Sequence, residues 1–169
     1  TALGSQGLYN NTTGESNTAV GIYSMYENTS GSRNAAIGRS SLGKNTTGSS
    51  NAGLGYFSLF ENTTGSYNAA IGEDALKANT TGSSNIAQGY QSLGSNSTGN
   101  KNIAIGQQAG FSNISGSNNV FIGYKAGYNE TGSNKMYIDN SDTTSPLIYG
   151  DFDEDTLTIN GRSEEHTSE

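Results

Sequence analysis

Few residues of this chain could serve as an acid, a base or a nucleophile. The sequence has no cysteine and one histidine, His166, which lies in the last eight residues. Glu73 and Asp74 are adjacent acids, but no other reactive side chain recurs at a fixed distance from them. Acid–base and nucleophilic catalysis need a positioned partner for the reacting group, so we expect a solvated acidic surface here. We assign no catalytic residue and predict a protein that is not an enzyme.

A second group of acids raises the question of calcium. These acids lie after residue 134, at Asp139, Asp142, Asp151, Asp153 and Asp155. An EF-hand loop needs oxygen ligands at alternate positions, a central glycine and a terminal glutamate. The acids do not follow that spacing, so we interpret them as solvated turns and predict neither a metal ion nor a cofactor.

The composition limits the elements that could position any site. Hydrophobic residues are 31% and charged residues 14% of the chain, against about 45–50% and 25% in ordinary domains. Its apolar runs are too short for a membrane-spanning helix or a signal peptide. Residues 1–134 hold six acids and six bases, so this part is neutral and lacks the basic stripe that nucleic acid requires. We expect a turn-rich β-protein that binds no nucleic acid and does not insert into a membrane in this stretch.

A repeat of 17 residues organises the chain. A glycine follows a short apolar box in every unit, at Gly4, Gly21, Gly38, Gly55, Gly72, Gly89, Gly106 and Gly123. The "strand asparagines" precede the box, at Asn17, Asn34, Asn51, Asn68, Asn85, Asn102 and Asn119. The "turn asparagines" begin an Asn-Thr-Thr-Gly-like turn, at Asn11, Asn28, Asn45, Asn62, Asn79, Asn96 and Asn113, with Asn129 one residue early. Chance does not hold this register over seven intervals, so self-similarity is the strongest signal in the sequence.

Each unit is too short for a pair of packed helices, and fixed glycines would weaken helices. The Asn-Thr-Thr-Gly stretch offers residues that tolerate positive φ, while the apolar box and the Ser-Leu segment fit short strands. We therefore predict one coil per repeat, built as strand, turn, strand and turn. One coil cannot bury its apolar residues alone, so the coils must stack as a parallel β-solenoid. At about 4.8 Å per coil, eight coils would be roughly 38 Å long.

Stacking turns each repeat position into a column of like residues. The main apolar column, which we expect to be the spine of the core, is Leu3, Val20, Ile37, Leu54, Ile71, Gln88, Ile105 and Ile122. The second apolar column is Leu8, Met25, Leu42, Leu59, Leu76 and Leu93, followed by Gly110 and Gly127. The small column, where we expect backbone or another chain to approach closely, is Ala2, Ala19, Ala36, Gly53, Ala70, Ala87, Ala104 and Phe121. We expect the strand asparagines to form a buried amide ladder, and Gln88 to be tolerated by ladder bonding or at a partly wet axis.

Two further columns raise alternatives for a binding surface. The aromatic column is Tyr9, Tyr26, Phe60, Phe111 and Tyr128, interrupted by Gly43, Lys77 and Gly94. We interpret it as a cover for the coil edges, with a glycan-stacking surface as the alternative. Two hydroxyl rows run from Thr12 and Thr13 to Ser97 and Thr98 and fail at Ile114 and Glu130. They resemble the threonine rows of ice-binding proteins. The turn asparagines also read as glycosylation sequons, but the turn explains them for backbone reasons alone.

The repeat resembles a known family. Its Asn-x-Ala-Ile-Gly-x-x-Ser/Ala pattern is similar to the head repeat of trimeric autotransporter adhesins of the Yersinia-adhesin type. Its spacing is closer to repeats of long bacterial surface proteins and phage tail-fibre-like proteins. This resemblance, over residues 1–134, implies a left-handed β-roll with three chains side by side, in a rigid fibre on a cell surface or a virion tail. The adhesin head repeat is shorter, so we carry over none of its ligand specificity.

Residues 135–161 break the period and are predicted to cap the array. Alternating patterns at 135–139, 146–149 and 156–160 indicate three short strands, and a solenoid needs an atypical end to block its open edge. This segment resembles the one that follows such repeats in bacterial tail-fibre proteins. Residues 162–169 resemble the in-frame translation of a sequencing-library adapter, so we treat them, with His166, as a disordered artefact.

Together these observations predict an all-β parallel β-solenoid of eight 17-residue coils, residues 1–134, with a short β cap, residues 135–161. The expected function is that of a non-enzymatic stalk or head of an extracellular homotrimeric fibre, of adhesin or tail-fibre type. A surface glycan and a host-surface or matrix protein are its candidate ligands. The alternative is an ice-binding β-solenoid that uses the stacked threonines.

Overall fold

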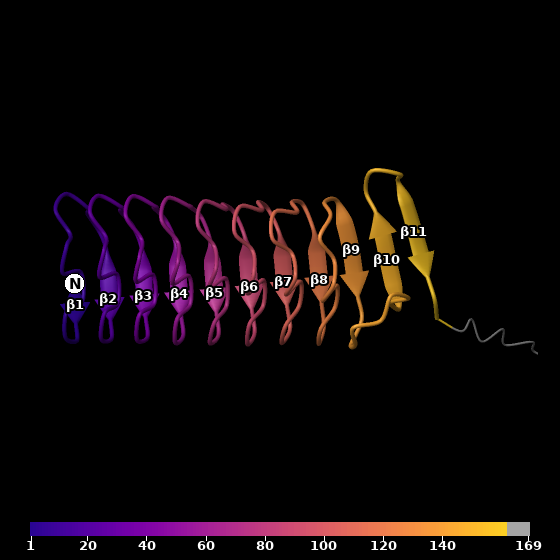
Figure 1. The fold of residues 1–169 in the computed structure, drawn as a ribbon, viewed down its shortest axis with the longest axis horizontal. Helices are drawn as coiled ribbons and strands as arrows, with labels where there is room; N and C mark the ends of the chain where they lie inside the picture. Colours follow the sequence, from indigo (N-terminus) through magenta and orange to yellow (C-terminus); the bar gives the residue numbers. More distant parts are fainter. Residues whose placement is uncertain (162–169) are drawn as a thin grey trace, which may run out of the picture.

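The computed structural model describes residues 1–161, which form one sheet of eleven strands without any helix, and so without one that could cross a membrane. Figure 1 shows the coils stacked side by side along the long axis of the molecule. The strands are β1 Ala2–Leu3, β2 Thr18–Val20, β3 Ala35–Ile37, β4 Ala52–Leu54, β5 Ala69–Ile71, β6 Ile86–Gln88, β7 Ile103–Ile105, β8 Val120–Ile122, β9 Lys135–Ile138, β10 Ile148–Asp151 and β11 Thr156–Ile159. The prediction for residues 162–169 lies outside the described residues.

The register of the sheet equals the sequence period. Strands β1 to β8 pair in parallel and in chain order, and each residue lies opposite the one 17 positions later, as Ile37 does with Leu54. One strand from each coil therefore adds to a single growing sheet (Figure 1). The predicted all-β parallel solenoid is confirmed.

Each coil holds one strand, so the prediction of two is wrong. The Ser-Leu segment is a turn, because Ser40 and Leu42 have φ angles of 57° and 51°, which an extended strand excludes. The segment still bonds to the next coil, since the N–H of Leu42 donates to the carbonyl of Ser58 at 2.9 Å. The equivalent positions are left-handed in the other coils as well. This conformation therefore belongs to the repeat, although it is unfavourable for residues with a side chain.

The Asn-Thr-Thr-Gly turn has no left-handed residue in the third coil, contrary to our expectation, since residues 45–48 all lack a positive φ. Glycine provides the bend at the end of the strand instead. Gly38 has a φ of 130°, and a Cβ there would lie 2.5 Å from the carbonyl oxygen of Gly55. Both the dihedral angle and the close approach of the next coil exclude a side chain at this position.

The core lies between the small column and the second apolar column. Ala36 and Leu42 are fully buried, whereas Ile37 is 45% and Ile71 46% exposed. The prediction that this exposed column is the spine of the core is therefore wrong. Neighbouring strand residues point to opposite faces of the sheet, and only the side chains of the small column fit between the strand and the facing turn. A Cβ on Gly53 would already lie 2.5 Å from Oγ of Ser41 on the facing turn. Gln88 shares the exposed column and needs neither a ladder nor a wet axis.

One exchange between the two buried columns shows how narrow the core is. Phe121 is fully buried in the small column. In the seventh and eighth coils the second apolar column has Gly110 and Gly127 in place of leucine. A Cβ on either glycine would overlap the Phe121 ring. Both glycines keep the left-handed backbone, at φ 61° and 59°. One ring thus fills the space that two leucine side chains occupy elsewhere in the stack.

Two asparagine ladders run along the solenoid. The strand asparagines form the ladder that we predicted: Asn51 donates through Nδ2 to the carbonyl of Gly65 at 2.8 Å and accepts the backbone N–H of Asn68 at 2.9 Å. The turn asparagines form a second ladder that we did not predict. Nδ2 of Asn62 donates to Oδ1 of Asn45 at 2.7 Å and to the carbonyl of Gly65 at 3.0 Å. Buried amides with satisfied hydrogen bonds rigidify the stack and specify its register.

The cap turns the parallel sheet into an antiparallel one. β9 continues the parallel pairing with β8, and β10 and β11 then pair antiparallel with their neighbours. The predicted strand at 146–149 begins two residues later, at Ile148. Pro146 has no N–H to donate to a ladder, which agrees with its place before the strand.

Candidate functional site

The two acids of the pair in the array have different surroundings. Asp74 lies beside Lys77, with 3.1 Å between Oδ1 and Nζ, while the neighbouring Glu73 is exposed to solvent. His166 lies outside the described residues. Within residues 1–161, no three histidine, cysteine or acidic side chains come together as a metal site.

Two acids of the cap, Asp139 and Asp142, contact different side chains. Asp139 accepts the hydroxyl of Ser141 at 2.6 Å, and Asp142 lies 3.7 Å from Nζ of Lys125. Asp155 lies in the turn before β11, with a φ of 52°.

Lys135 joins two more of these acids, with Nζ 2.6 Å from Asp151 and 3.6 Å from Asp153. The hydrogen bond between Lys135 and Asp151 raises the pKa of the lysine and lowers that of the aspartate. This pair links β9 to β10.

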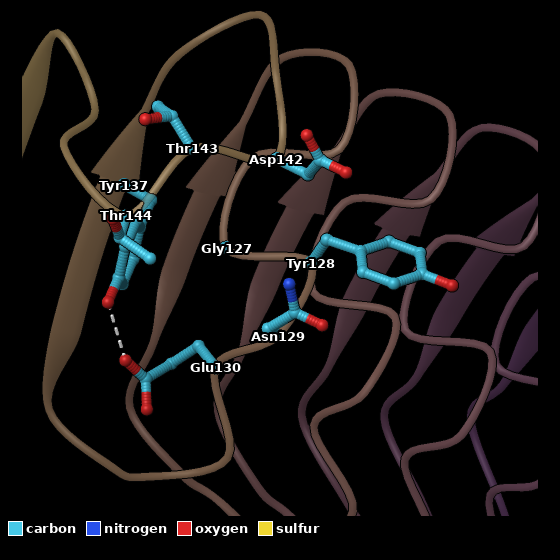
Figure 2. A pocket seen from close by; sticks show the side chains of 8 residues that line it. All are labelled: Gly127, Tyr128, Asn129, Glu130, Tyr137, Asp142, Thr143 and Thr144. Atoms are coloured by element: carbon cyan, nitrogen blue, oxygen red, sulfur yellow. Dashed lines mark hydrogen bonds between the residues drawn. The ribbon is translucent and has the colours of Figure 1, made fainter.

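A pocket of about 140 Å³ lies where the last coil meets the cap. Figure 2 shows the Tyr137 hydroxyl directed at Glu130, and the hydroxyl donates to Oε2 at 2.6 Å. Burial and this carboxylate raise the pKa of Tyr137 well above its ordinary value of 10.0. Oε1 of Glu130 accepts the backbone N–H groups of Thr131 and Gly132. Both carboxylate oxygens accept hydrogen bonds, so Glu130 connects the last coil to β9.

The outward face of β1 to β8 is a mainly apolar strip, interrupted by the exposed Thr18 and Gln88, which we call the outer face. One of its two columns is the predicted spine, from Leu3 to Ile122. The other is Thr18, Ala35, Ala52, Ala69, Ile86, Ile103 and Val120. Neither column contains a charged residue. Five isoleucines of the two columns (Ile37, Ile71, Ile86, Ile103 and Ile105) are 36–46% exposed, and soluble monomers rarely expose large apolar patches.

The two hydroxyl rows differ in whether their hydroxyls are hydrogen-bonded to the backbone. The Thr46 hydroxyl donates to the carbonyl of Thr63 at 2.9 Å, and the equivalent bonds recur at Thr12, Thr29, Thr63 and Thr80. The second row, represented by Thr47, is exposed. Ice binding would therefore have one row of free hydroxyls in place of two.

The turn asparagines that read as glycosylation sequons use their side-chain amides in the second ladder. Asn28, Asn45, Asn62 and Asn79 are fully buried, and each amide nitrogen donates to the preceding asparagine and to a glycine carbonyl. A glycan on these nitrogens would break the ladder.

Rings of the aromatic column stack on each other where two neighbouring coils both carry one. Tyr9 stacks on Tyr26, with 5.4 Å between the ring centroids, and Phe111 stacks on Tyr128 at 5.3 Å. Where Gly43 interrupts the column, the next ring, Phe60, lies close over the glycine. The interruption leaves a shallow hollow in the surface.

The chain matches no protein-family model, no curated protein and no solved structure. The functional inference therefore depends on the geometry of these surfaces.

Proposed function

We propose that this chain is a structural, non-enzymatic segment of an extracellular trimeric fibre, a stalk or head of adhesin or tail-fibre type. Three copies pack side by side through their outer faces. The observation that carries the proposal is the uncharged, mainly apolar outer face, which runs along the eight coils with Gln88 as an exposed amide in the sixth. The resemblance of the repeat supplies the number of chains and the extracellular setting.

Packing energetics support this assembly. Burial of the exposed half of one isoleucine is worth about 1 kcal/mol, and Ile37, Ile71 and Ile105 are 40–46% exposed. Similar contacts recur in coil after coil, so the gain grows with the length of the array. The small column then forms the core within each chain, and the large apolar column forms the core between chains.

The proposed role of the array is mechanical. Each coil bonds to the next through its backbone and two asparagine ladders, so bending the stack would break many bonds at once. A stiff rod of this kind holds a binding tip away from the surface that carries it.

The test is the mass of the chain in solution, measured by light scattering on a sizing column over a concentration series. We expect about three times the chain mass of 17.5 kDa. Ile71→Asp should reduce the mass to that of a monomer, because the charge would be buried between outer faces. Ile114→Asp is the matched control, since Ile114 is 58% exposed on a turn, and it should remain a trimer. A monomeric parent chain at every concentration would refute the proposal.

A further inference from the structure

The aromatic column contains a hollow that the edge-covering role does not explain. Five of the eight coils carry an aromatic ring at this position, but the third coil carries Gly43. The hollow there is about 270 Å³ in volume. This is close to the lower end of the range for small-molecule sites in proteins, about 300 Å³, and suits a single six-membered ring.

Four aromatic rings line the hollow. Tyr23 and Tyr26 belong to the second coil and meet edge to face, with 5.6 Å between centroids. Phe57 and Phe60 belong to the fourth coil and meet in the same way at 4.6 Å. The walls therefore come from two different coils, and the glycine of the coil between them keeps the space open.

Polar groups complete the lining of the hollow. Ser40 is 6% exposed as a residue and lines the hollow. The Glu27 carboxylate is exposed and unpaired within residues 1–161. Lys44 lies over the Phe60 ring at 5.0 Å and bonds Glu61 at 2.7 Å. The hydroxyl, carboxylate and ammonium groups of this lining can exchange hydrogen bonds with a ligand that brings its own hydroxyls.

A second hollow repeats this chemistry three coils further along. Gly94 interrupts the same column, and the hollow of about 200 Å³ is lined by Phe111 and by polar side chains of Asp74, Lys77 and Gln91. Three coils correspond to about 14 Å along the solenoid. The two hollows thus lie in one row, parallel to the long axis of the molecule.

We propose that these hollows are carbohydrate subsites, each of which takes a neutral pyranose ring of a surface glycan. The C–H face of the sugar lies on the aromatic wall, and its hydroxyls bond the carboxylate, hydroxyl and ammonium groups that line the hollow. Two subsites in a row suit a glycan chain that runs along the fibre, and occupancy of both raises the avidity.

The polar lining favours a sugar over an apolar side chain of a partner protein. An apolar side chain would cover Ser40 and Glu27 without offering hydrogen bonds, and each buried polar group left unpaired is costly. The unpaired carboxylate of Glu27 also disfavours acidic sugars through like-charge repulsion, which leaves neutral ones.

This inference rests on the proposed function, because a fibre outside the cell comes into contact with surface glycans. The subsites are nevertheless built from the turns and include no residue of the outer face. A trimer that binds no saccharide and a monomer that does would therefore separate the two proposals.

The test is saturation-transfer NMR of the full chain with neutral trisaccharides of glucose, galactose, mannose and N-acetylglucosamine. We expect at least one to receive saturation at its ring C–H protons. Gly43→Tyr fills the first hollow with a ring that other coils carry there, and should weaken the signal. Adding Gly94→Tyr should abolish it. Glu27→Gln should weaken binding about tenfold, through loss of a charged hydrogen-bond acceptor.

Tyr67→Ala is the matched control, because Tyr67 is a 66% exposed tyrosine of the array that lines neither hollow. It should bind as the parent chain does. The proposal is overturned if no trisaccharide binds, or if binding survives Gly43→Tyr with Gly94→Tyr. It is also overturned if only an apolar dye binds in a Gly43-dependent way, since the hollow would then be a docking site for apolar protein side chains.

Discussion

The exchange between Phe121 and its two facing glycines gives a quantitative test of the core. Phe121→Ala restores the small side chain found at this column position in the other coils, but leaves Gly110 and Gly127 without a ring to fill the space. Truncation of a buried phenylalanine costs about 3–5 kcal/mol. We expect a loss of unfolding free energy in that range.

The compensating changes should restore what the truncation removes. Gly110→Leu and Gly127→Leu place leucines at positions with φ angles of 61° and 59°, close to the 47–52° of the leucines and methionine in this column. In the presence of Phe121, each leucine overlaps the ring and should destabilise the chain by about 1–3 kcal/mol or more. Combined with Phe121→Ala, the two leucines should bring the unfolding free energy to within about 1 kcal/mol of the parent chain.

The assay is urea unfolding followed by circular dichroism, at one protein concentration because association changes apparent stability. Amide exchange in the seventh and eighth coils, for example at the N–H of Gly110 that bonds to Ala126, reports the same effect locally. Additive losses in the triple variant would refute the packing argument, because independent sites show no coupling.

Four further predictions concern the ladders, the cap and the turns. Asn62→Ala leaves Oδ1 of Asn45 without its donor and removes one of the two acceptors of Nδ2 of Asn79, so we expect a loss of about 2–4 kcal/mol in urea unfolding, with the exposed Asn129→Ala nearly neutral. The raised pKa values of Tyr137 and Tyr149 keep both hydroxyls protonated in the folded cap, so stability should fall as pH rises above their ordinary value of 10.0, and Tyr137→Phe should reduce this loss in a melting series. Because the pKa of Asp151 is lowered on folding, its carboxylate stabilises the cap above pH 3.8, and this stabilisation is lost as the pH falls through the lower folded pKa. The same melting series, with Asp151→Asn for comparison, measures this loss. Finally, the chain should show no thermal hysteresis in an ice-growth assay, because the first threonine row bonds to its own backbone; clear hysteresis would favour the ice-binding alternative.

The period of the sequence was sufficient to predict the coil, the parallel register and the ladder of strand asparagines. Hydrophobicity alone did not predict which face of each strand lies in the core. A strand that alternates Ala and Ile carries two apolar faces, and the usual expectation places the larger side chains inside. Here the facing turn lies so close that only alanine or glycine fits opposite Leu42 and its equivalents.

The sequence did contain the signal for this arrangement. Phe121 is the one large residue of the small column, and Gly110 and Gly127 are the small residues of the second apolar column. Opposite changes of volume in neighbouring coils indicate that the two columns face each other. The left-handed turn residues left no such trace, because serine, leucine, tyrosine and lysine all occur at those positions.

The eighth coil differs from the others by a single residue, since Val120 pairs with Met136 at a separation of 16 rather than 17. The ladder of turn asparagines ends there, at Asn113, whose Oδ1 has no donor within residues 1–161 because the next coil offers Glu130. Upstream of this point both asparagine ladders continue from coil to coil in one register. Adding or deleting a whole repeat keeps that register, and the rod changes length in steps of about 4.8 Å. The shortened coil marks the place where such growth stops, so rod length can evolve independently of the cap.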